Sequence, residues 1–334
     1  LQDTALALKA PLDSPALVTP TINGIAQSGY TGFKNHIING GFDVWQRGTS
    51  FTGSGGGQYS ADRWFTRRNT GATGYSVSRN SVTGGSMQRY SIGLKRISGD
   101  SNTNYIWAGT ILETANAIKL RGKTVTLSFW ARCGVAYTPS DSEINLRVVS
   151  STESDAGWYS SGANMLSEVA IASNVYNLTT TFQKFASTFT VPEDCNTLGV
   201  PIRTGNFVGT ADNNDFVLIS GIQLEEGSVA TPFEVLPVGL TLSLCQRYYI
   251  SSGGTYINAN AQLNSTTNLL RRANIYFPTE MRNIPTIAIL SYGTGWASAP
   301  TPNQSSTTST SISGYASSAT SGTSILRYTA DSEL

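Results

Sequence analysis

Apolar and polar positions alternate along much of the chain from about residue 34 onward, with the period of two that is typical of β-strands. The segment 124–133, TVTLSFWARC, is the clearest example: one face carries Val125, Leu127, Phe129, Ala131 and Cys133, and the other carries Thr124, Thr126, Ser128, Trp130 and Arg132. The segments 143–150 and 182–191 alternate similarly, whereas 215–227 is apolar on both faces and is predicted to be a central buried strand. Short strands with Gly, Ser and Asn turns and no long amphipathic helix predict an all-β, antiparallel β-sandwich.

The composition and periodicity of the sequence change twice, which predicts that the chain has three structural parts. Residues 1–33 hold short apolar clusters separated by Pro or Gly and are predicted to be an extended fibre-shaft or connector segment, ordered only against copies of itself. Residues 34–237 form the predicted sandwich. Residues 238–334 form a smaller strand-rich domain that opens with a short helix over 240–249 and contains an uncharged tail, 298–324, before a last strand. Because the chain starts at Leu1, we expect it to be a piece of a longer polypeptide.

Composition and charge exclude several classes of function. Charged residues make up only 13% of the 334 residues and the net charge is +1 with no basic stripe, so nucleic acid is not expected as a partner. No apolar run reaches the roughly 18 residues of a membrane span. The three cysteines form no CxxC motif, which predicts buried free thiols; Cys133 in particular alternates onto an apolar face.

Residues suited to catalysis are sparse. His36 is the only histidine and has no flanking nucleophile motif, so histidine-based catalysis and histidine metal sites are not expected. We expect His36 to have a structural or surface role. The adjacent pair Glu225–Glu226 precedes Gly227 and is interpreted as a strand end running into a turn. The glycine runs at 53–58 and 83–86 lack the Lys-Ser/Thr ending of a phosphate-binding loop. We therefore predict that the protein is not an enzyme.

Two pairs of Trp and Arg have the chemistry of a sugar-binding site. Trp130 and Arg132 share the polar face of 124–133, where an indole can stack on a sugar ring and a guanidinium can bind its hydroxyls. Trp45 and Arg47 form a second pair, beside a Gly-rich loop that would leave the corner open to solvent. The alternatives are that a loop covers Trp130, and that Trp45 and Arg47 make structural cation–π or corner contacts.

An ordered set of motifs resembles the C-terminal regions of bacteriophage tail-fibre and related tail proteins. The motifs are NGGFDVWQRGTSF, YSADRWF, GKTVTLSFWARCG, FTVPEDC, ISGIQLEEGSVATPFE and LCQRYY, and they cover nearly the whole chain. Individual pieces also resemble jelly-roll carbohydrate-binding modules. The resemblance implies a jelly-roll sandwich whose first strand is 39–45, and a homotrimeric, virion-borne fibre attached to other tail or baseplate proteins on its N-terminal side. Some modules of this kind hold a structural calcium near the opening strand; only Asp43 matches such a ligand, and no other cofactor is implied.

The leading hypothesis for function is a tail-fibre receptor-binding protein that adheres to bacterial surface polysaccharide without cleaving it. Such a protein would be assembled in the host cytoplasm and located in the virion tail. Two alternatives stay open: a depolymerase spike that cuts the glycan, and a purely structural tail connector or cap.

Overall fold

The computed structural model describes residues 21–22, 25–26, 33–53, 55–69, 72–83, 88–158, 165–253, 257–258, 260–263, 269–293, 296–315 and 325–333. The chain forms two compact units, Leu1–Lys34 and Asn35–Leu334. In the first unit, β1 (Thr21–Ile22) pairs antiparallel with β2 (Ile25–Ala26). Apart from residue 33, the rest of the predicted 1–33 segment lies outside the described residues, as does most of the glycine run at 83–86. The predicted boundaries at 33/34 and 237/238 stay predictions.

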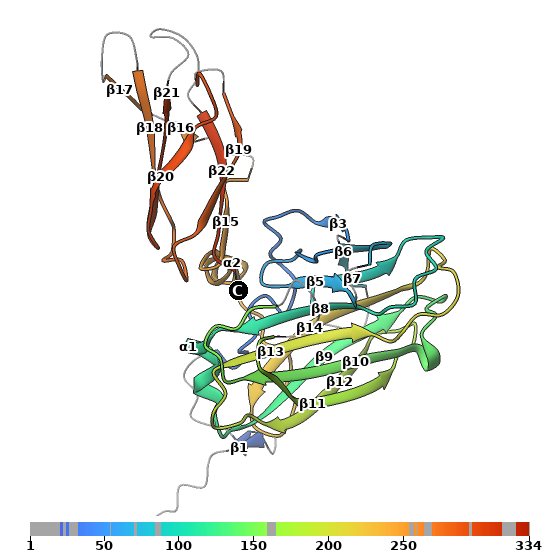
Figure 1. Ribbon diagram of the computed structural model, residues 1–334. Coiled ribbons are helices and arrows are strands. Elements are labelled where there is room, and N and C mark those ends of the chain that lie inside the picture. The colour runs from blue at the N-terminus through green and yellow to red at the C-terminus, as the bar shows by residue number, and fades with distance from the viewer. Residues whose placement is uncertain are drawn as a thin grey trace, which may run out of the picture. The chain divides into compact units, whose positions relative to one another are not determined.

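The second unit contains a sandwich of two six-stranded antiparallel sheets (Figure 1). Sheet I has the order β12-β9-β14-β7-β6-β3: β12 (Gln183–Thr190), β9 (Thr124–Cys133), β14 (Phe216–Glu226), β7 (Tyr90–Arg96), β6 (Tyr75–Ser81) and β3 (Ser50–Thr52). Sheet II has the order β11-β10-β13-β8-β5-β4: β11 (Glu168–Asn177), β10 (Glu143–Ser151), β13 (Thr197–Thr204), β8 (Ile106–Leu112), β5 (Phe65–Arg68) and β4 (Gln58–Tyr59). Short helical turns, α1 (Thr114–Ala117), η2 (Ile118–Leu120) and η3 (Ser140–Ser142), join some of them.

The strand order defines a jelly roll. The eight consecutive strands β7 to β14 divide into the orders 7-14-9-12 in sheet I and 8-13-10-11 in sheet II. This is the double Greek-key arrangement of the fold, with β6 and β3 added to one sheet and β5 and β4 to the other. The all-β, antiparallel jelly-roll prediction is therefore confirmed.

The strands predicted from alternation pack as expected. Strand β9 has the predicted bounds, and its apolar face is buried in one cluster that both sheets share. Strand β14 lies between β9 and β7, which confirms the central buried strand, and it is interrupted by a bulge at Gly221, whose φ is 58°. The bulge allows β14 to bend where the next segment docks on it.

The prediction that residues 39–45 form the first strand is wrong. Asn39 and Phe42 have positive φ angles of 58°, and the segment turns instead of extending. Its carbonyls and amides bond to the β14 bulge: Gly40 O accepts the Ile222 amide at 3.0 Å, and a Cβ at Gly40 would lie 2.0 Å from Ile222 O. Side-chain bonds from Asn39 replace ladder bonds, so the Asn-Gly-Gly motif forms a plug and not a strand.

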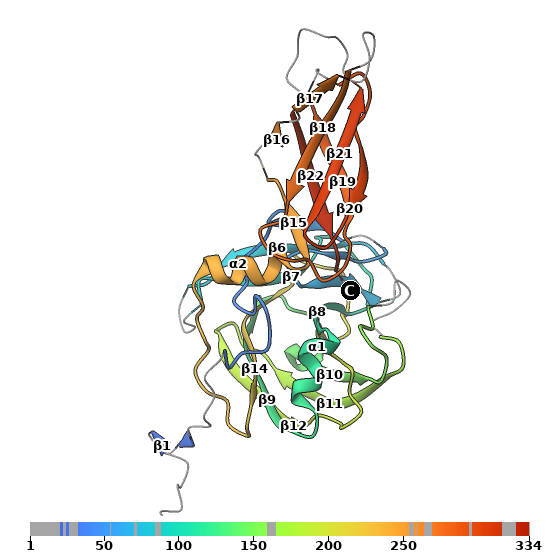
Figure 2. The same ribbon diagram turned by 90° about the vertical axis from the view of Figure 1, so that its left-hand side faces the viewer.

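A second, smaller sandwich follows the helix α2 (Val238–Gln246), which confirms the predicted short helix near 240–249 (Figure 2). Its first sheet pairs β22 (Ile325–Asp331) with β15 (Tyr249–Ser251), β16 (Ile257–Asn258) and β19 (Thr286–Tyr292). Its other sheet has the order β17 (Asn260–Leu263), β18 (Leu269–Tyr276), β21 (Ser309–Tyr315) and β20 (Thr301–Ser305). A separate apolar cluster around Trp296, Ile312 and Leu326 fills this sandwich.

The composition of the uncharged tail 298–324 predicts that it is ordered only by contact between subunits, and the structure differs from this. Within 301–315, β20 pairs with β21 and β21 pairs with β18 of the same chain, so contact between subunits is not needed to order these strands. Ile312 is fully buried and packs in the core of the second sandwich, although the composition of the tail, almost wholly small and polar, does not predict a core residue there. Residues 316–324 lie outside the described part.

The three thiols are free and buried, as predicted. Burial raises the pKa of the Cys133 thiol, which disfavours the reactive thiolate. None of the helices in the described part of the chain combines the length and apolarity that crossing a membrane would require.

Candidate functional site

Three segments meet at one end of sheet II and form a polar pocket of about 150 Å³. Strands β8 and β10 both begin here, and the antiparallel strand β13 between them ends here. The pocket is lined by Tyr105, Glu143, Asn145, Arg203, Thr204, Gly205 and Asn206. This volume has room for several water molecules and suits one small polar ring.

The Thr204 hydroxyl is bonded within the fold, but four other polar side chains of this pocket are not used by it. The Arg203 guanidinium lies 5.0 Å from the centroid of the Tyr105 ring. Within the described part of the chain, the side chains of Glu143, Asn145, Arg203 and Asn206 have no hydrogen bond or ion pair. A cation, an anion and two amides therefore face one pocket with their bonding capacity free.

Two buried arginines hold the loops that carry this pocket. Arg68 donates to the carbonyls of Asn102 and Asn104 at 2.7 and 3.0 Å, directly before Tyr105. Arg96 donates to the carbonyls of Val208 and Gly209 at 3.4 and 2.8 Å, shortly after Asn206. Both guanidiniums are fully buried, so the loops are positioned from inside the sandwich.

This arrangement suits recognition of a neutral sugar ring. Arg203 and the two amides can donate to sugar oxygens, Glu143 and the amide oxygens can accept from sugar hydroxyls, and Tyr105 offers an apolar ring face. A glycosidase needs a pair of carboxyl groups about the scissile bond, and the described lining contains one, Glu143.

The predicted pair Trp130 and Arg132 lies on the outer face of sheet I, on the opposite side of the sandwich. Both side chains are half-buried. Arg132 lies between two rings, 5.6 Å from Phe182 and 5.4 Å from Phe216. A Cβ at Gly221 would lie 3.2 Å from the edge of the Trp130 indole, so the bulge packs closely beside this ring. The structure thus keeps the pair together and partly accessible, and glycan binding there stays a prediction.

Replacing Trp130 with Ala tests how far the ring belongs to the core. Because the ring is half-buried, we expect the free energy of unfolding to fall by about 1–3 kcal/mol in urea titrations. A loss clearly above about 3 kcal/mol would identify a core residue and would contradict an accessible stacking ring.

Next to this face, the acidic pair Glu225–Glu226 has structural roles, in agreement with its interpretation as a strand end. Glu225 is buried and accepts the backbone amide of Thr231 at 2.9 Å and the side-chain amide of Gln223 at 2.8 Å. Glu226 pairs with Lys123 at 2.7 Å. The segment after β14 is thereby tied down over the outer face of sheet I.

The second predicted pair, Trp45 and Arg47, is not open to solvent, and this expectation is corrected. The Trp45 ring is 8% exposed and its Nε1 donates to Phe42 O at 2.8 Å. Arg47 pairs with Asp331 at 3.1 Å and lies 3.4 Å from the Tyr249 ring. The corner meets the second sandwich, whose chain end supplies the carboxylates, so a sugar has no access to the indole.

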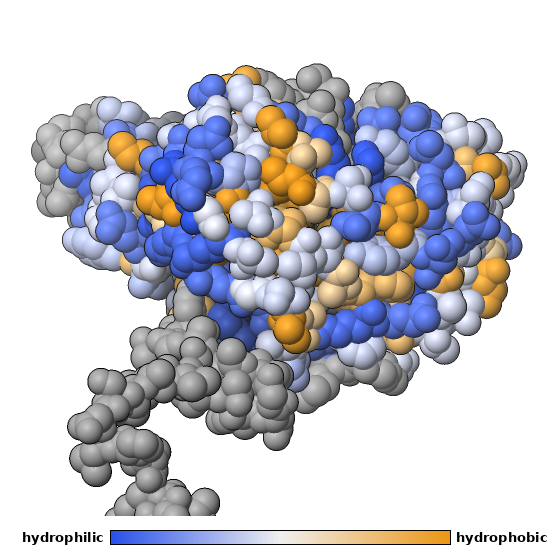
Figure 3. All heavy atoms as spheres, turned by 90° about the horizontal axis from the view of Figure 1, so that it is seen from below, coloured by the Kyte–Doolittle hydropathy of each residue, from blue (hydrophilic) through white to orange (hydrophobic). Residues whose placement is uncertain are grey.

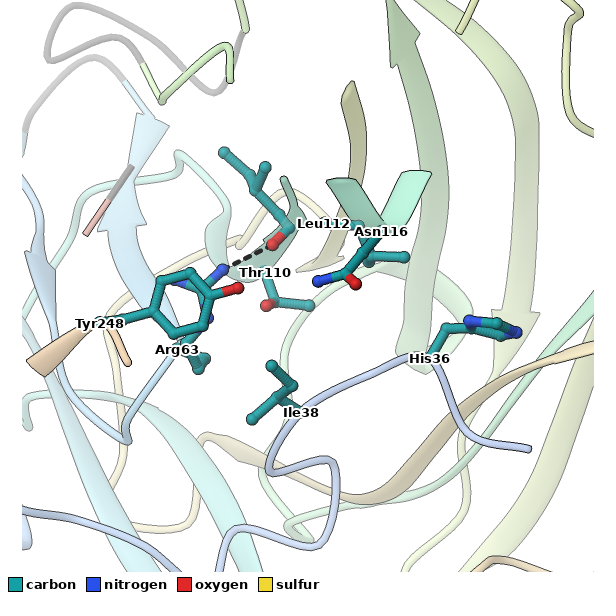
Figure 4. Close-up of a pocket in the computed structure, with 8 residues that line it drawn as sticks. His36, Ile38, Arg63, Thr110, Leu112, Asn116 and Tyr248 are labelled. Atoms are coloured by element: carbon teal, nitrogen blue, oxygen red, sulfur yellow. Dashed lines mark hydrogen bonds between the residues drawn. The ribbon is translucent and has the colours of Figure 1, made fainter. Parts of the chain in front are cut away.

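The contact between this corner and the second sandwich, called the junction below, also contains a more deeply buried arginine, Arg63. Its Nη1 pairs with the Glu333 carboxylate. Its Nη2 donates to Ile111 O at 2.6 Å, and Tyr248 lies over it with the ring centroid 3.6 Å away (Figure 4). A cavity of about 10 Å³ beside Arg63 and Tyr248 is just large enough for one water. His36 also lines this cavity and is half-buried, which fits the predicted structural role.

Asp62, which lies at this junction, should make the free energy of unfolding depend on pH. Burial raises the pKa of its carboxyl above 3.8, although hydrogen bonds from Gln46 act in the opposite direction. The folded protein therefore holds this proton more tightly than the unfolded chain, so its contribution to stability is lost as the pH rises through the raised pKa. Between about pH 4 and about pH 7, the free energy of unfolding of the wild type should fall more than that of Asp62→Asn.

Urea unfolding at several pH values measures this difference, with the exposed Asp141→Asn as a matched control that should follow the wild type. Parallel pH profiles for wild type and Asp62→Asn would contradict it.

The surroundings of Asp43 do not fit the calcium ion that the resemblance implies. Burial raises the pKa of Asp43, and the charges that act on it are those of Arg89 and Arg79. Among the described residues, no group of three or more His, Cys, Asp or Glu side chains could hold a metal. Two cations beside one carboxylate disfavour a divalent cation.

Sequence reasoning missed the pocket residues Tyr105, Glu143, Arg203 and Asn206. The outward position of Asn145 follows from the alternation of 143–150, and this was the available signal. The others come from segments about 40 to 60 residues apart, and only the order of the strands brings them together.

No protein-family model and no curated protein matches the sequence. Solved structures with a similar fold include a family 4 carbohydrate-binding module, with a TM-score of 0.33 and 20% identity over 57% of this chain and 100% of that one. A family 61 carbohydrate-binding module in complex with β-1,4-galactotriose has a TM-score of 0.33 and 13% identity, over 58% of this chain and 100% of its own. The enzymatically active domain of tailspike protein 4 of bacteriophage CBA120 has a TM-score of 0.37 and 12% identity, over 58% of this chain and 21% of that chain. These likenesses are distant, and the fold assignment rests on the strand order.

Proposed function

We propose that the jelly roll binds glycan of the bacterial surface through the pocket at the end of sheet II. The observation that carries the proposal is the gathering of the unpaired Arg203, Glu143 and Asn145 around one pocket of about 150 Å³ beside the Tyr105 ring. Polar groups left free in a pocket are the usual means by which a protein orients a polar ligand. Hydroxyls of a sugar match this mixture of donors and acceptors without requiring a net charge.

The wider role is that of an adhesive tail-fibre protein of a virion, which holds the glycan without cleaving it. Its support is the ordered set of sequence motifs, together with the single carboxyl in the described pocket lining. Incubation of the protein with host polysaccharide should leave the chain length unchanged in gel filtration. Shortening of the chains would favour a depolymerase.

The proposed assembly is a homotrimer that joins other tail proteins on its N-terminal side. Besides the Pro-punctuated segment 1–33, its support is the outer edge of β11, which pairs with no further strand in the described part of the chain, and the exposed Val169 and Val175 on this strand. Figure 3, which views the molecule from the side on which β11 lies in Figure 1, shows apolar side chains among polar ones. Light scattering should give three times the mass of one chain.

Two arginine variants on opposite faces locate the site. Arg203→Ala should lower affinity for purified lipopolysaccharide or capsular polysaccharide by about tenfold or more, because Arg anchors dominate small contact areas. Arg132→Ala removes the same side chain from the outer face of sheet I. A loss with Arg132→Ala alone, measured by biolayer interferometry, would contradict the pocket and place the site on the Trp130 face.

A further inference from the structure

The floor of the pocket continues along one row of paired residues across sheet II. Asn145 pairs with Arg203, Arg203 with Trp107, and Trp107 with Arg67, on four neighbouring strands. Directly opposite residues in such a row have Cβ atoms about 4.5–5.5 Å apart. Trp107 is therefore the next side chain beside Arg203, and a sugar chain that ran from the pocket across the sheet would have to pass over it.

Trp107 is closed off by a second indole. It is completely buried, and the ring of Trp158 meets it edge-on, with the centroids 5.0 Å apart and an interplanar angle of 64°. Its Nε1 has no hydrogen-bond acceptor in the described part of the chain. The Phe65 ring also contacts Trp107, with the centroids 5.5 Å apart. A stacking platform next to the pocket is thus present in the sheet but covered, with Trp158 as the second indole over it.

The centre of sheet II is shaped to receive Trp158. A Cβ at Gly109 would lie 2.8 Å from Trp158 Cζ2, and a Cβ at Gly199 would lie 3.1 Å from its Cη2. The two glycines lie on the neighbouring strands β8 and β13, and they leave a flat area that the indole fills. Larger residues at these positions would push Trp158 away from the sheet.

Bonds near Trp158 hold it in this position. Ala156 N donates to Thr197 Oγ1 at 3.1 Å, and Trp158 itself forms an antiparallel bridge with Met165. Met165 N donates to Glu168, which pairs with Arg147 at 2.8 Å. Trp158 is therefore held over Trp107 and forms a wall next to Arg203, the pocket residue that pairs with Trp107.

We infer that the pocket recognises the terminal sugar of a glycan, and that Trp158 excludes internal stretches of a linear chain. This inference rests on the proposed function of the pocket. One sugar enters between Tyr105 and Arg203, the rest of the glycan extends away from the sheet, and the wall at Trp158 blocks the direction along which a continuous chain would need to pass. Sugars beyond the first add little to the affinity.

Chain-length dependence tests the inference, with fragments of one to six sugars from O-polysaccharide as probes. The affinity of the wild type, measured by calorimetry, should change by less than about threefold from the shortest bound fragment to the hexasaccharide. Trp158→Ala uncovers Trp107, so its affinity should rise by about tenfold or more over the same series. Trp158→Phe keeps a ring over Trp107 and is the matched control, expected to behave as the wild type.

Melting curves establish that each variant is folded, and Trp158→Leu replaces Trp158→Ala if the latter is not. A wild-type affinity that rises about tenfold with length would overturn the inference, as would a folded Trp158→Ala that shows no length dependence. If no fragment binds in a manner that Arg203→Ala weakens, the proposed function itself fails, and the inference fails with it.

Discussion

Replacing Glu333 with Ala should lower the free energy of unfolding by about 3–5 kcal/mol, because the change leaves the buried Arg63 without its counter-charge. Arg63 is 2% exposed, and the Glu333 side chain is 3% exposed. Burial alone would lower the pKa of Arg63, but Glu333 reverses this and raises it, so the variant loses the charge that offsets the burial of the guanidinium.

Asp331→Ala is the matched control, because it removes a carboxylate from the same chain end. The Asp331 side chain is 43% exposed and pairs with Arg47 at 3.1 Å. Exposed pairs contribute about 0–1 kcal/mol, so this variant should unfold in urea almost as the wild type does. Equal losses for the two variants would show that Arg63 does not depend on Glu333.

The same junction explains why the sequence misleads at Trp45 and Arg47. A Trp beside an Arg after a turn has the same local pattern whether it faces solvent or another part of the chain. The difference lies in Asp331 and Glu333, about 285 residues away, which no local pattern connects to Arg47. Long-range pairing therefore decides exposure here.

Elements that alternate were predictable, because each face of a strand has one environment. Strand β9 alternates throughout and was predicted with its bounds, and β14 was placed in the centre because it is apolar on both faces. The rule does not hold for segment 39–45, because this segment is a turn and not a strand. Asn39 stabilises the turn with side-chain hydrogen bonds, and the apolar residues of the segment pack into the core of the sandwich. The candidate pocket was not predictable, since it requires the order of the strands in sheet II.

The loops around the pocket depend on a buried charge in the jelly roll, which connects stability with the candidate site. Arg96 is fully buried, pairs with Asp215 at 3.0 Å, and donates to the carbonyls of Val208 and Gly209. Asp215 is buried too, and burial raises the pKa of its carboxyl despite Arg96. The loop that carries Asn206 is thus held by a side chain from the opposite sheet.

Arg96→Met should lower the free energy of unfolding by about 3–5 kcal/mol, because it leaves the buried Asp215 without its counter-charge and the carbonyls of Val208 and Gly209 without this donor. Arg79→Met is the matched control: Arg79 is half-buried against the Tyr90 ring, 4.5 Å from its centroid, and we expect a loss of about 1 kcal/mol or less. Urea unfolding measures both. At temperatures where Arg96→Met is still folded, its affinity for surface polysaccharide should also fall, because the loop after Asn206 loses its anchor. Undiminished binding by a destabilised Arg96→Met would show that the pocket does not depend on this loop, and would place the recognition of glycan elsewhere on the sandwich.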